Sequence, residues 1–346
     1  MKTPEDVKKV ISAQTEVLDQ ELQKVFASTP NLPLYDHLAY FMGFKNEALE
    51  SEISYGGKRF RSSLMVMLGE WFDKKDEVLP FAVALELYHN FTLIHDDVID
   101  KDTHRRGRPT VWKLFGHDHA INDGDAQLII MSEMLAHAAG GSTAGPEAQR
   151  FLLQQFRIVI EGQYLDFELT EKKIGDEGVD EAAYLDMIRR KTAELIVAAA
   201  RGAGLVSLRP EAELKALEQF GRSLGLAYQI CDDTYSIWAS SEQTGKRNYG
   251  DIKERKKTLP ILFAHGNLAG ADKTKLEQVF AGEDELTNSD CEEVIKLLDS
   301  VDTKTAMEAV IEGHASDAKN AVETLSLYDE QKDTLKVLVD SLLPKV

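Results

Sequence analysis

The stretch that most constrains the fold is VLPFAVALELYHNFTLIHDDVID, residues 78–100. Apolar side chains surround most of its helical circumference, which predicts a helix buried in the middle of a domain. The same stretch carries Asp96, Asp97 and Asp100 close together near its end. Because a buried charge is costly unless something pairs it, we expect this helix to bring its carboxylates to a ligand.

Helical spacing also dominates the rest of the chain. Residues 184–206 and 217–238 are apolar on most helical faces, and no clean alternating runs bounded by turn residues indicate strands. Glycine- and proline-containing breaks separate the expected helices, and no internal repeat interrupts the pattern. We therefore expect an all-α fold, a single large helical bundle over residues 1–346, with its motifs in about 10–265 and packed C-terminal helices over 268–346.

Composition narrows the class of partner. The net charge is −19, from 40 basic and 59 acidic residues, which disfavours nucleic-acid binding and favours divalent cations. The two cysteines, Cys231 and Cys291, are too few for a disulfide framework and fit a reducing cytosol. The N-terminus lacks the apolar core of a signal peptide, and no run approaches the roughly 20 apolar residues of a transmembrane segment. A cytoplasmic protein is expected.

The first acidic group predicts a metal site. Asp96 and Asp100 are four residues apart and share a helical face, with Asp97 beside them. The helix is expected to end near Pro109, so these carboxylates lie in its C-terminal half, where they oppose the helix dipole. Oxygen ligands without clustered histidine or cysteine favour Mg²⁺ over zinc.

A second acidic group lies within residues 217–238. Gln229, Asp232, Asp233 and Ser236 follow one helical stripe, at the spacing i, i+3, i+4, i+7. Mg²⁺ bridges carboxylates to substrate phosphates, so two acid-bearing buried helices predict a diphosphate held between them. Arginine and lysine, which bind phosphate, recur in GGKRFR, HRRGRP, RRKTAEL and TGKRNYGDIKERKKTLP.

Taken in order, these motifs resemble those of trans-isoprenyl diphosphate synthases of the geranylgeranyl and farnesyl kind. The resemblance also includes HNFTLIHDDVIDKDTHRRGRPTVW, EGQYLDFEL and YQICDDTYSIW. It implies an all-helical fold around a deep central cavity, usually in a homodimer. The implied reaction joins isopentenyl diphosphate to an allylic prenyl diphosphate with the help of three Mg²⁺ ions, most simply giving geranylgeranyl diphosphate, with farnesyl diphosphate next.

The resemblance also implies roles for individual residues. The expected metal ligands are Asp96, Asp97, Asp100, Asp232 and Asp233. The residues expected at the allylic diphosphate are Arg105, Lys191, Thr192, Gln229, Lys246 and Lys256. Those expected at isopentenyl diphosphate are Lys58, Arg61, His89 and Arg106. Gln163 and Asp166 match a segment that lines the cavity. Catalysis is assigned to the three acids of the first motif with Lys191, Asp232 and Lys246.

Two of these assignments have an ordinary alternative. A lone histidine on a buried helix is more often a core residue, but His89 lies two helical turns before Asp96 on the same face, which together with the resemblance favours function. Chain length is expected to depend on the residues before the first motif, which are Tyr88, Phe91 and Thr92. The bulky ring of Phe91 could equally be core packing.

One departure from the motif keeps a rival open. Ser236 stands where the family usually has a third aspartate in the second motif. A class I terpene cyclase, which acts on a single prenyl diphosphate, has a serine or threonine there and a glutamate four residues on, but this chain has Ser240. A cyclase also has no use for a second diphosphate site. A non-enzymatic subunit of a partner synthase would be expected to lose first-motif aspartates, and all three are present.

Overall fold

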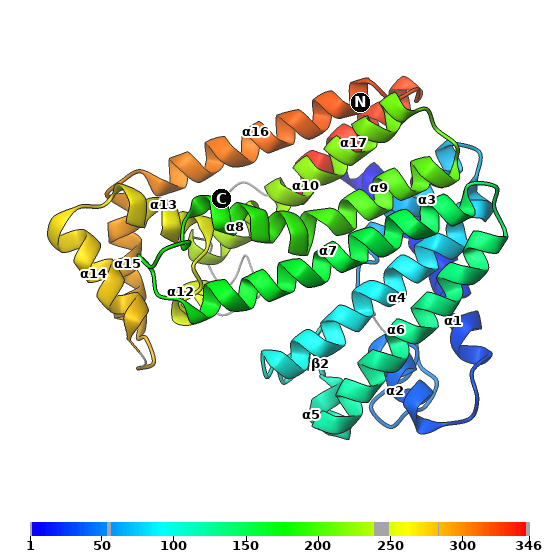
Figure 1. Cartoon of the computed structure of the whole chain (residues 1–346), viewed down its shortest axis with the longest axis horizontal. Coiled ribbons are helices and arrows are strands. Elements are labelled where there is room, and N and C mark those ends of the chain that lie inside the picture. Colours follow the sequence, from blue (N-terminus) through cyan, green and yellow to red (C-terminus); the bar gives the residue numbers. More distant parts are fainter. Residues whose placement is uncertain (1, 54–56, 239–248, 283, 344–346) are drawn as a thin grey trace. The chain divides into compact units, whose positions relative to one another are not determined.

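The structure, a computed structural model, describes residues 2–53, 57–238, 249–282 and 284–343. Most of this part of the chain is helical (Figure 1), and the strands found in it are two short ones, β1 (His104–Arg105) and β2 (Arg108–Pro109). The all-α prediction is therefore confirmed. The chain forms two compact units, one of residues 3–153 with 198–214 and the other of residues 1–2, 154–197 and 215–346. We call these the N-terminal and C-terminal units.

Two long antiparallel helices, α4 and α6, form the centre of the N-terminal unit and lie side by side in Figure 1. Its complete elements, besides the β1–β2 hairpin, are α1 (Pro4–Ala27), α2 (Pro33–Phe41), α3 (Phe60–Trp71), α4 (Lys75–Ile99), α5 (Val111–Phe115) and α6 (His117–Gly140). Thr3 caps α1 with a reciprocal hydrogen-bond box that includes Asp6, and Pro4 begins the helix.

The C-terminal unit contains most of the remaining helices, and its boundaries with the N-terminal unit fall inside α7, α9 and α10. The elements are α7 (Gly145–Glu171), α8 (Glu181–Ile188), η1 (Arg189–Ala193), α9 (Glu194–Val206), α10 (Glu211–Trp238), α12 (Gly250–Lys253), α13 (Leu259–Asn267), α14 (Gly270–Ala281), α15 (Asn288–Asp299), α16 (Thr303–Glu323) and α17 (Asp329–Leu342). Both cysteines lie here, buried and free of disulfides.

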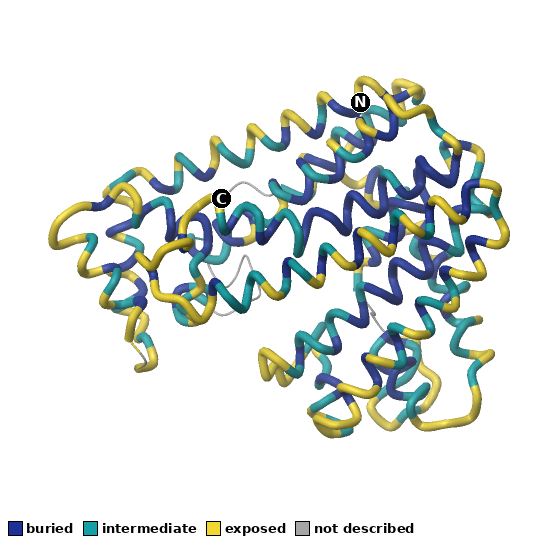
Figure 2. The backbone as a smooth tube through the Cα atoms, viewed as in Figure 1, coloured by how far each residue is buried: buried dark blue, intermediate teal, exposed yellow. Residues whose placement is uncertain are grey.

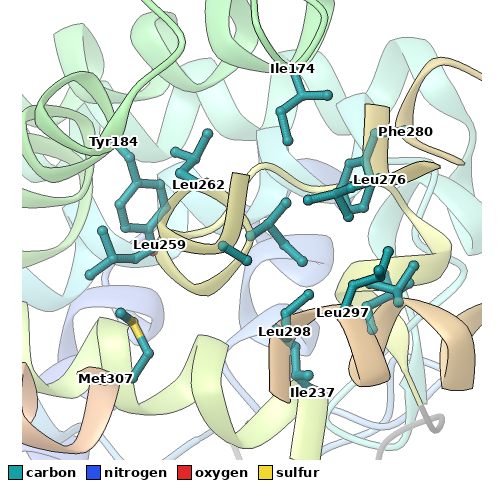
Figure 3. Close-up of a cluster of buried hydrophobic side chains, with 14 of the residues drawn as sticks. Ile174, Tyr184, Ile237, Leu259, Leu262, Leu276, Phe280, Leu297, Leu298 and Met307 are labelled. Atoms are coloured by element: carbon teal, nitrogen blue, oxygen red, sulfur yellow. The ribbon is translucent and has the colours of Figure 1, made fainter. Parts of the chain in front are cut away.

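A large apolar core holds the C-terminal unit together (Figure 3). Side chains from α8, α10, α13, α14, α15 and α16 converge there, among them Tyr184, Ile237, Leu259, Leu276 and Met307. Burial of this apolar surface provides the main favourable term for folding of the unit. It also fixes the helices that carry the second acidic group.

The helix that was expected to be central, α4, is buried along most of its length. Its residues from Phe81 to Tyr88 are almost completely inaccessible, and exposure is higher in its first and last turns (Figure 2). The prediction that this helix ends near Pro109 is wrong, because α4 ends at Ile99. Lys101 adopts the left-handed conformation with φ 56°, and the N–H of Asp102 donates to the carbonyl of Asp97 at 3.0 Å, an arrangement that closes a helix.

Candidate active site

The first acidic group lies at the C-terminal end of α4. Asp96 is half-buried in the last turn, and Asp100 is exposed at the C-cap, where its N–H donates to the carbonyl of Asp96 at 2.8 Å. The negative end of the helix dipole points toward both carboxylates. The placement therefore disfavours folding by itself and favours a bound cation.

Asp97, between them, has a different environment. It is buried, and its Oδ1 accepts a hydrogen bond of 2.6 Å from Nε of Arg105 on β1. Its Oδ2 is buried without a hydrogen-bond partner among the described residues. Burial raises the pKa of Asp97 to about 6, against the lowering effect of Arg105. The short hydrogen bond thus ties the hairpin to the end of α4 and orients the Arg105 guanidinium.

The residues predicted at isopentenyl diphosphate come together in the N-terminal unit. Nη1 of Arg61 lies 3.3 Å from Nε2 of His89. A Cβ atom added at Gly57 would lie 2.6 Å from Cζ of Arg106, so only glycine lets that guanidinium pack against the loop. Gly57 also has φ 107°, which favours glycine. Lys58 follows at an exposed position. Arg61 and Arg106 therefore lie with His89 in one group beside Lys58, and we call it the cationic group after its two arginines.

His89 is neutral in this setting. Burial, with Arg61 next, lowers the pKa of His89 to about 3. An uncharged ring can accept at Nε2 from Arg61 while Nδ1 carries the proton, and Nδ1 is buried without a hydrogen-bond partner in the described part of the chain. His89 therefore adds to the two guanidinium groups an uncharged ring whose N–H has no partner among the described residues.

The candidate chain-length residues lie one to two turns before the first motif. Tyr88 and Phe91 are both buried, with ring centroids 5.7 Å apart, and Phe91 also packs edge-on against His95 at 5.0 Å. The hydroxyl of Thr92 donates to the carbonyl of His89 at 2.8 Å, so it serves the helix backbone. Both rings are therefore packed in the interior of the N-terminal unit, just before the first motif.

The second acidic group lies near the C-terminal end of α10, in the C-terminal unit. Asp233 is buried, and its carboxylate accepts hydrogen bonds from the hydroxyl of Tyr184 and from Nε2 of Gln229, the latter at 2.9 Å. Gln229 in turn accepts from the hydroxyl of Thr192 at 2.9 Å. Asp232 is exposed. The two aspartates therefore differ as Asp96 and Asp97 do, with one carboxylate accessible and its neighbour held by donors.

Lys191 and Thr192 lie in a π-helical turn, η1, which interrupts the predicted helix over residues 184–206. Such turns occur frequently at functional sites. Nζ of Lys191 donates to Oδ2 of Asp166 at 2.5 Å, and Gln163 is half-buried on the same helix, α7. A Cβ atom added at Gly162 would lie 2.3 Å from the backbone nitrogen of Lys191, so α7 and the π turn meet backbone to backbone.

Sequence reasoning missed a third carboxylate near the second motif. The hydroxyl of Ser236 donates to Oδ2 of Asp251, at the start of α12. Burial raises the pKa of Asp251, opposed by the Ser236 hydrogen bond and by Lys256, whose Nζ lies 3.8 Å from Oδ1. The sequence signal that could have identified Asp251 is the Gly250-Asp251 pair in TGKRNYGDIKERKKTLP. Lys246 and Ser240 lie outside the described residues.

The donor atoms suit a hard cation. In the described part of the chain, no group of three or more histidine, cysteine or acidic residues is arranged to hold a metal by itself. Mg²⁺ usually takes one or two protein carboxylates and completes its shell with water and substrate phosphates. Asp96 with Asp100 in one unit, and Asp232 in the other, offer such oxygen ligands.

Comparison with known proteins identifies the family. The family model for polyprenyl synthetases matches residues 44–298. The chain belongs to this family. Similar proteins include a (2E,6E)-farnesyl diphosphate synthase of Mycobacterium tuberculosis, 37% identical over 67% of this chain and 64% of its own length. A geranylgeranyl diphosphate synthase of the same organism is 34% identical over 77% of this chain and 75% of its own length.

This chain has the same fold as a polyprenyl synthetase from Streptomyces coelicolor. The TM-score is 0.87 at 27% identity, with 98% of this chain and 100% of the other covered. The match to the mycobacterial farnesyl diphosphate synthase spans somewhat less than two thirds of that relative. The resemblance found in the sequence is confirmed, and the prediction of an enzyme agrees with the names of these relatives. Within the described residues, no helix has the length and apolar character needed to cross a bilayer.

Proposed function

We propose that the chain is a prenyltransferase that condenses isopentenyl diphosphate with an allylic diphosphate, head to tail, into a short all-trans prenyl diphosphate. The observation that carries this proposal is the cationic group of Arg61, His89 and Arg106 in the same unit as the acidic end of α4. A condensation of two diphosphates needs a metal site for one diphosphate and a separate anion site for the other. The acidic end of α4 and the cationic group would provide these two sites. The family and its named relatives support the same reaction.

Mg²⁺ is the proposed cofactor, in keeping with the donor set. When bound, it would neutralise the allylic diphosphate and make it a better leaving group. We propose Asp96, Asp100 and Asp232 as its ligands. Asp97 instead accepts a hydrogen bond from Arg105 and holds that side chain in place. Asp233 does the same for Gln229 and Tyr184.

The protein's cations complete the proposed mechanism. Arg105, Lys191 and Lys256, with Thr192 and Gln229 as hydrogen-bonding partners, bind the allylic diphosphate, and Lys246 is expected to join them. Cleavage of the allylic C–O bond leaves both electrons on the diphosphate. The double bond of isopentenyl diphosphate, held by Lys58, Arg61, His89 and Arg106, then forms the new C–C bond. A proton is lost to the departing diphosphate, so no protein nucleophile is required. Fixed charges of this kind act most strongly where water is excluded.

The product is proposed to be geranylgeranyl diphosphate, with farnesyl diphosphate next. The buried ring of Phe91 five residues before Asp96 supports a short product. The relatives make either product at similar identity, so they do not decide between them. A homodimer, which the resemblance implies, and a cytoplasmic location, which the cysteine content and the N-terminal sequence predict, stay predictions.

The test compares the purified chain with an allylic diphosphate in the presence and absence of isopentenyl diphosphate, with Mg²⁺ in both reactions. We expect consumption of the allylic substrate only when isopentenyl diphosphate is present, with a chain longer by five-carbon units. Conversion of the allylic diphosphate alone into a hydrocarbon would instead establish the cyclase. The hydrogen bonds of Ser236 to Asp251 and to the carbonyl of Asp233 count against that rival.

A further inference from the structure

Arg59, in the middle of the GGKRFR motif, has an unusual backbone and a buried side chain. Its φ of 48° and ψ of 22° are left-handed, a conformation that is unfavourable for a residue other than glycine. Its side chain is only 1% exposed. Strain of this kind persists only where the surroundings determine it, and it is concentrated at functional sites.

Three hydrogen bonds hold the guanidinium of Arg59. Nε donates to Oδ1 of Asp19 on α1 at 3.0 Å, Nη1 donates to Oε1 of Glu86 on α4 at 3.1 Å, and Nη2 donates to the carbonyl of Met42 at 2.6 Å. Two carboxylates and a carbonyl thus compensate for the loss of water around the buried cation. The loop before α3 is thereby attached to α1, α4 and the end of α2.

Glu86 is the centre of this network. It is 2% exposed, and it accepts two further hydrogen bonds, 2.9 Å from the hydroxyl of Ser62 and 2.7 Å from Nδ2 of Asn90. Burial alone would raise the pKa of Glu86, but the Arg59 guanidinium, helped by the Ser62 hydrogen bond, lowers it to about 2. The carboxylate is therefore ionised, and its position on α4 is fixed from several sides.

The network shares its chain segments with the cationic group, on the GGKRFR loop and on α4. Arg59 is flanked by Lys58 and is two residues before Arg61, while Glu86 is three residues before His89 on α4. The pair Arg59–Glu86 thus joins the loop to the helix at the level where Arg61 approaches His89 at 3.3 Å. A shift of the loop would separate Arg61 from His89.

We propose that Arg59 is a positioning residue for isopentenyl diphosphate: through Glu86 and Asp19 it holds Lys58 and Arg61 in register with His89. This inference rests on the proposed function. A buried ion pair is weak evidence of stability by itself, because apolar replacements are often as stable. Two features point to a positioning role for the Arg59–Glu86 pair beyond packing. The backbone at Arg59 is left-handed, and Lys58 and Arg61, the proposed diphosphate-binding residues, lie beside it in the sequence.

The experiment measures steady-state kinetics of the full chain and of Arg59→Lys, Glu86→Gln and Asp19→Asn. Each variant is expected to raise the KM for isopentenyl diphosphate while the KM for the allylic substrate stays within about twofold. The expected rise is about tenfold for Arg59→Lys, the equivalent of 1.4 kcal/mol. Arg59→Met should raise the KM for isopentenyl diphosphate more than Arg59→Lys does, because lysine keeps the positive charge and can form one hydrogen bond.

Asp19→Asn decides the matter if the buried variants fail to fold, because Asp19 is partly exposed, at 34%. The matched control is Asp36→Asn, which breaks the 2.6 Å ion pair with Lys45 at a similar exposure of 38% and should change neither KM. Folded variants with the wild-type KM for isopentenyl diphosphate would overturn the positioning role. A wild-type chain without isopentenyl-dependent condensation would instead overturn the proposed function.

Discussion

Adjacent aspartates in each motif have unequal environments. Asp96 is half-buried at the end of α4, whereas Asp97 is buried and bound to Arg105 at 2.6 Å. On α10 the exposed carboxylate is Asp232, and Asp233 is held by Gln229 and Tyr184. The sequence shows two equivalent acids in each pair. The difference arises only when the partner residues fold against one of them.

The different environments of Asp96 and Asp97 predict different kinetic effects for the two Asp→Asn substitutions. Asp96→Asn should reduce kcat by about 10²–10³-fold or more and raise the Mg²⁺ concentration for half-maximal rate, because an electrostatic contact to the leaving group is lost. Asp97→Asn should leave the Mg²⁺ requirement unchanged and raise mainly the KM for the allylic substrate through Arg105. Rates titrated with Mg²⁺ separate the two, and equal shifts in both variants would contradict the assignment.

Glu86 gives a pH prediction at the same scale. Its pKa is lowered from 4.5 to about 2, so its ionised form stabilises the fold fully above pH 4.5. The contribution falls as the pH drops through the window from 4.5 to 2, because the unfolded chain takes up a proton first. The free energy of unfolding of the wild type should therefore exceed that of Glu86→Gln at pH 7, and the difference should shrink below pH 4.5. Urea titrations measure it, and a pH-independent difference would count against the ion pair.

At the level of elements, the sequence predicted which segments are helical better than where they end. The buried run around Tyr88 and the stripe on α10 follow helical periodicity closely, and both helices are present. The end of α4 depends on the left-handed Lys101, and the π turn around Lys191 depends on contact with Gly162. Neither has a clear signal in the sequence, because lysine is not a residue that marks a left-handed position and the π turn lies where another helix, α7, approaches its backbone.

The same limit explains the missed site residues. GGKRFR contains two arginines, and periodicity does not show that Arg59 turns inward while Arg61 meets His89. That choice depends on the φ of 48° at Arg59. Asp251 was missed because it reaches Ser236 from 15 residues further along the chain.

The α4 helix also carries the prediction for product length. Phe91→Ala removes a buried ring next to Tyr88 and should lengthen the product by one or more isoprene units. Phe81→Ala, on the same helix and completely buried, is the control, and it should lose stability by about 3–5 kcal/mol with no change of product. Chromatography of the dephosphorylated products gives the answer. An unchanged chain length in a folded Phe91→Ala protein would assign the ring to the core.

For the whole molecule, the two acidic groups belong to different compact units. Asp96 and Asp100 lie in the N-terminal unit, and Asp232 and Asp251 lie in the C-terminal unit. The sequence predicted one bundle of 346 residues, and that prediction stands as an expectation. The match to the Streptomyces coelicolor fold covers 98% of this chain, so both units belong to the family fold. The proposed chemistry requires the two groups to act on one diphosphate.

The most direct measurement is a crystal structure of the chain with Mg²⁺ and a non-cleavable thio-analogue of an allylic diphosphate. We expect Asp96, Asp100 and Asp232 to bind Mg²⁺ ions on the same diphosphate, with its prenyl tail in apolar surroundings beside Phe91. This expectation would be contradicted by a diphosphate bound at one acidic group alone, with the carboxylates of Asp96 and Asp232 facing separate surfaces.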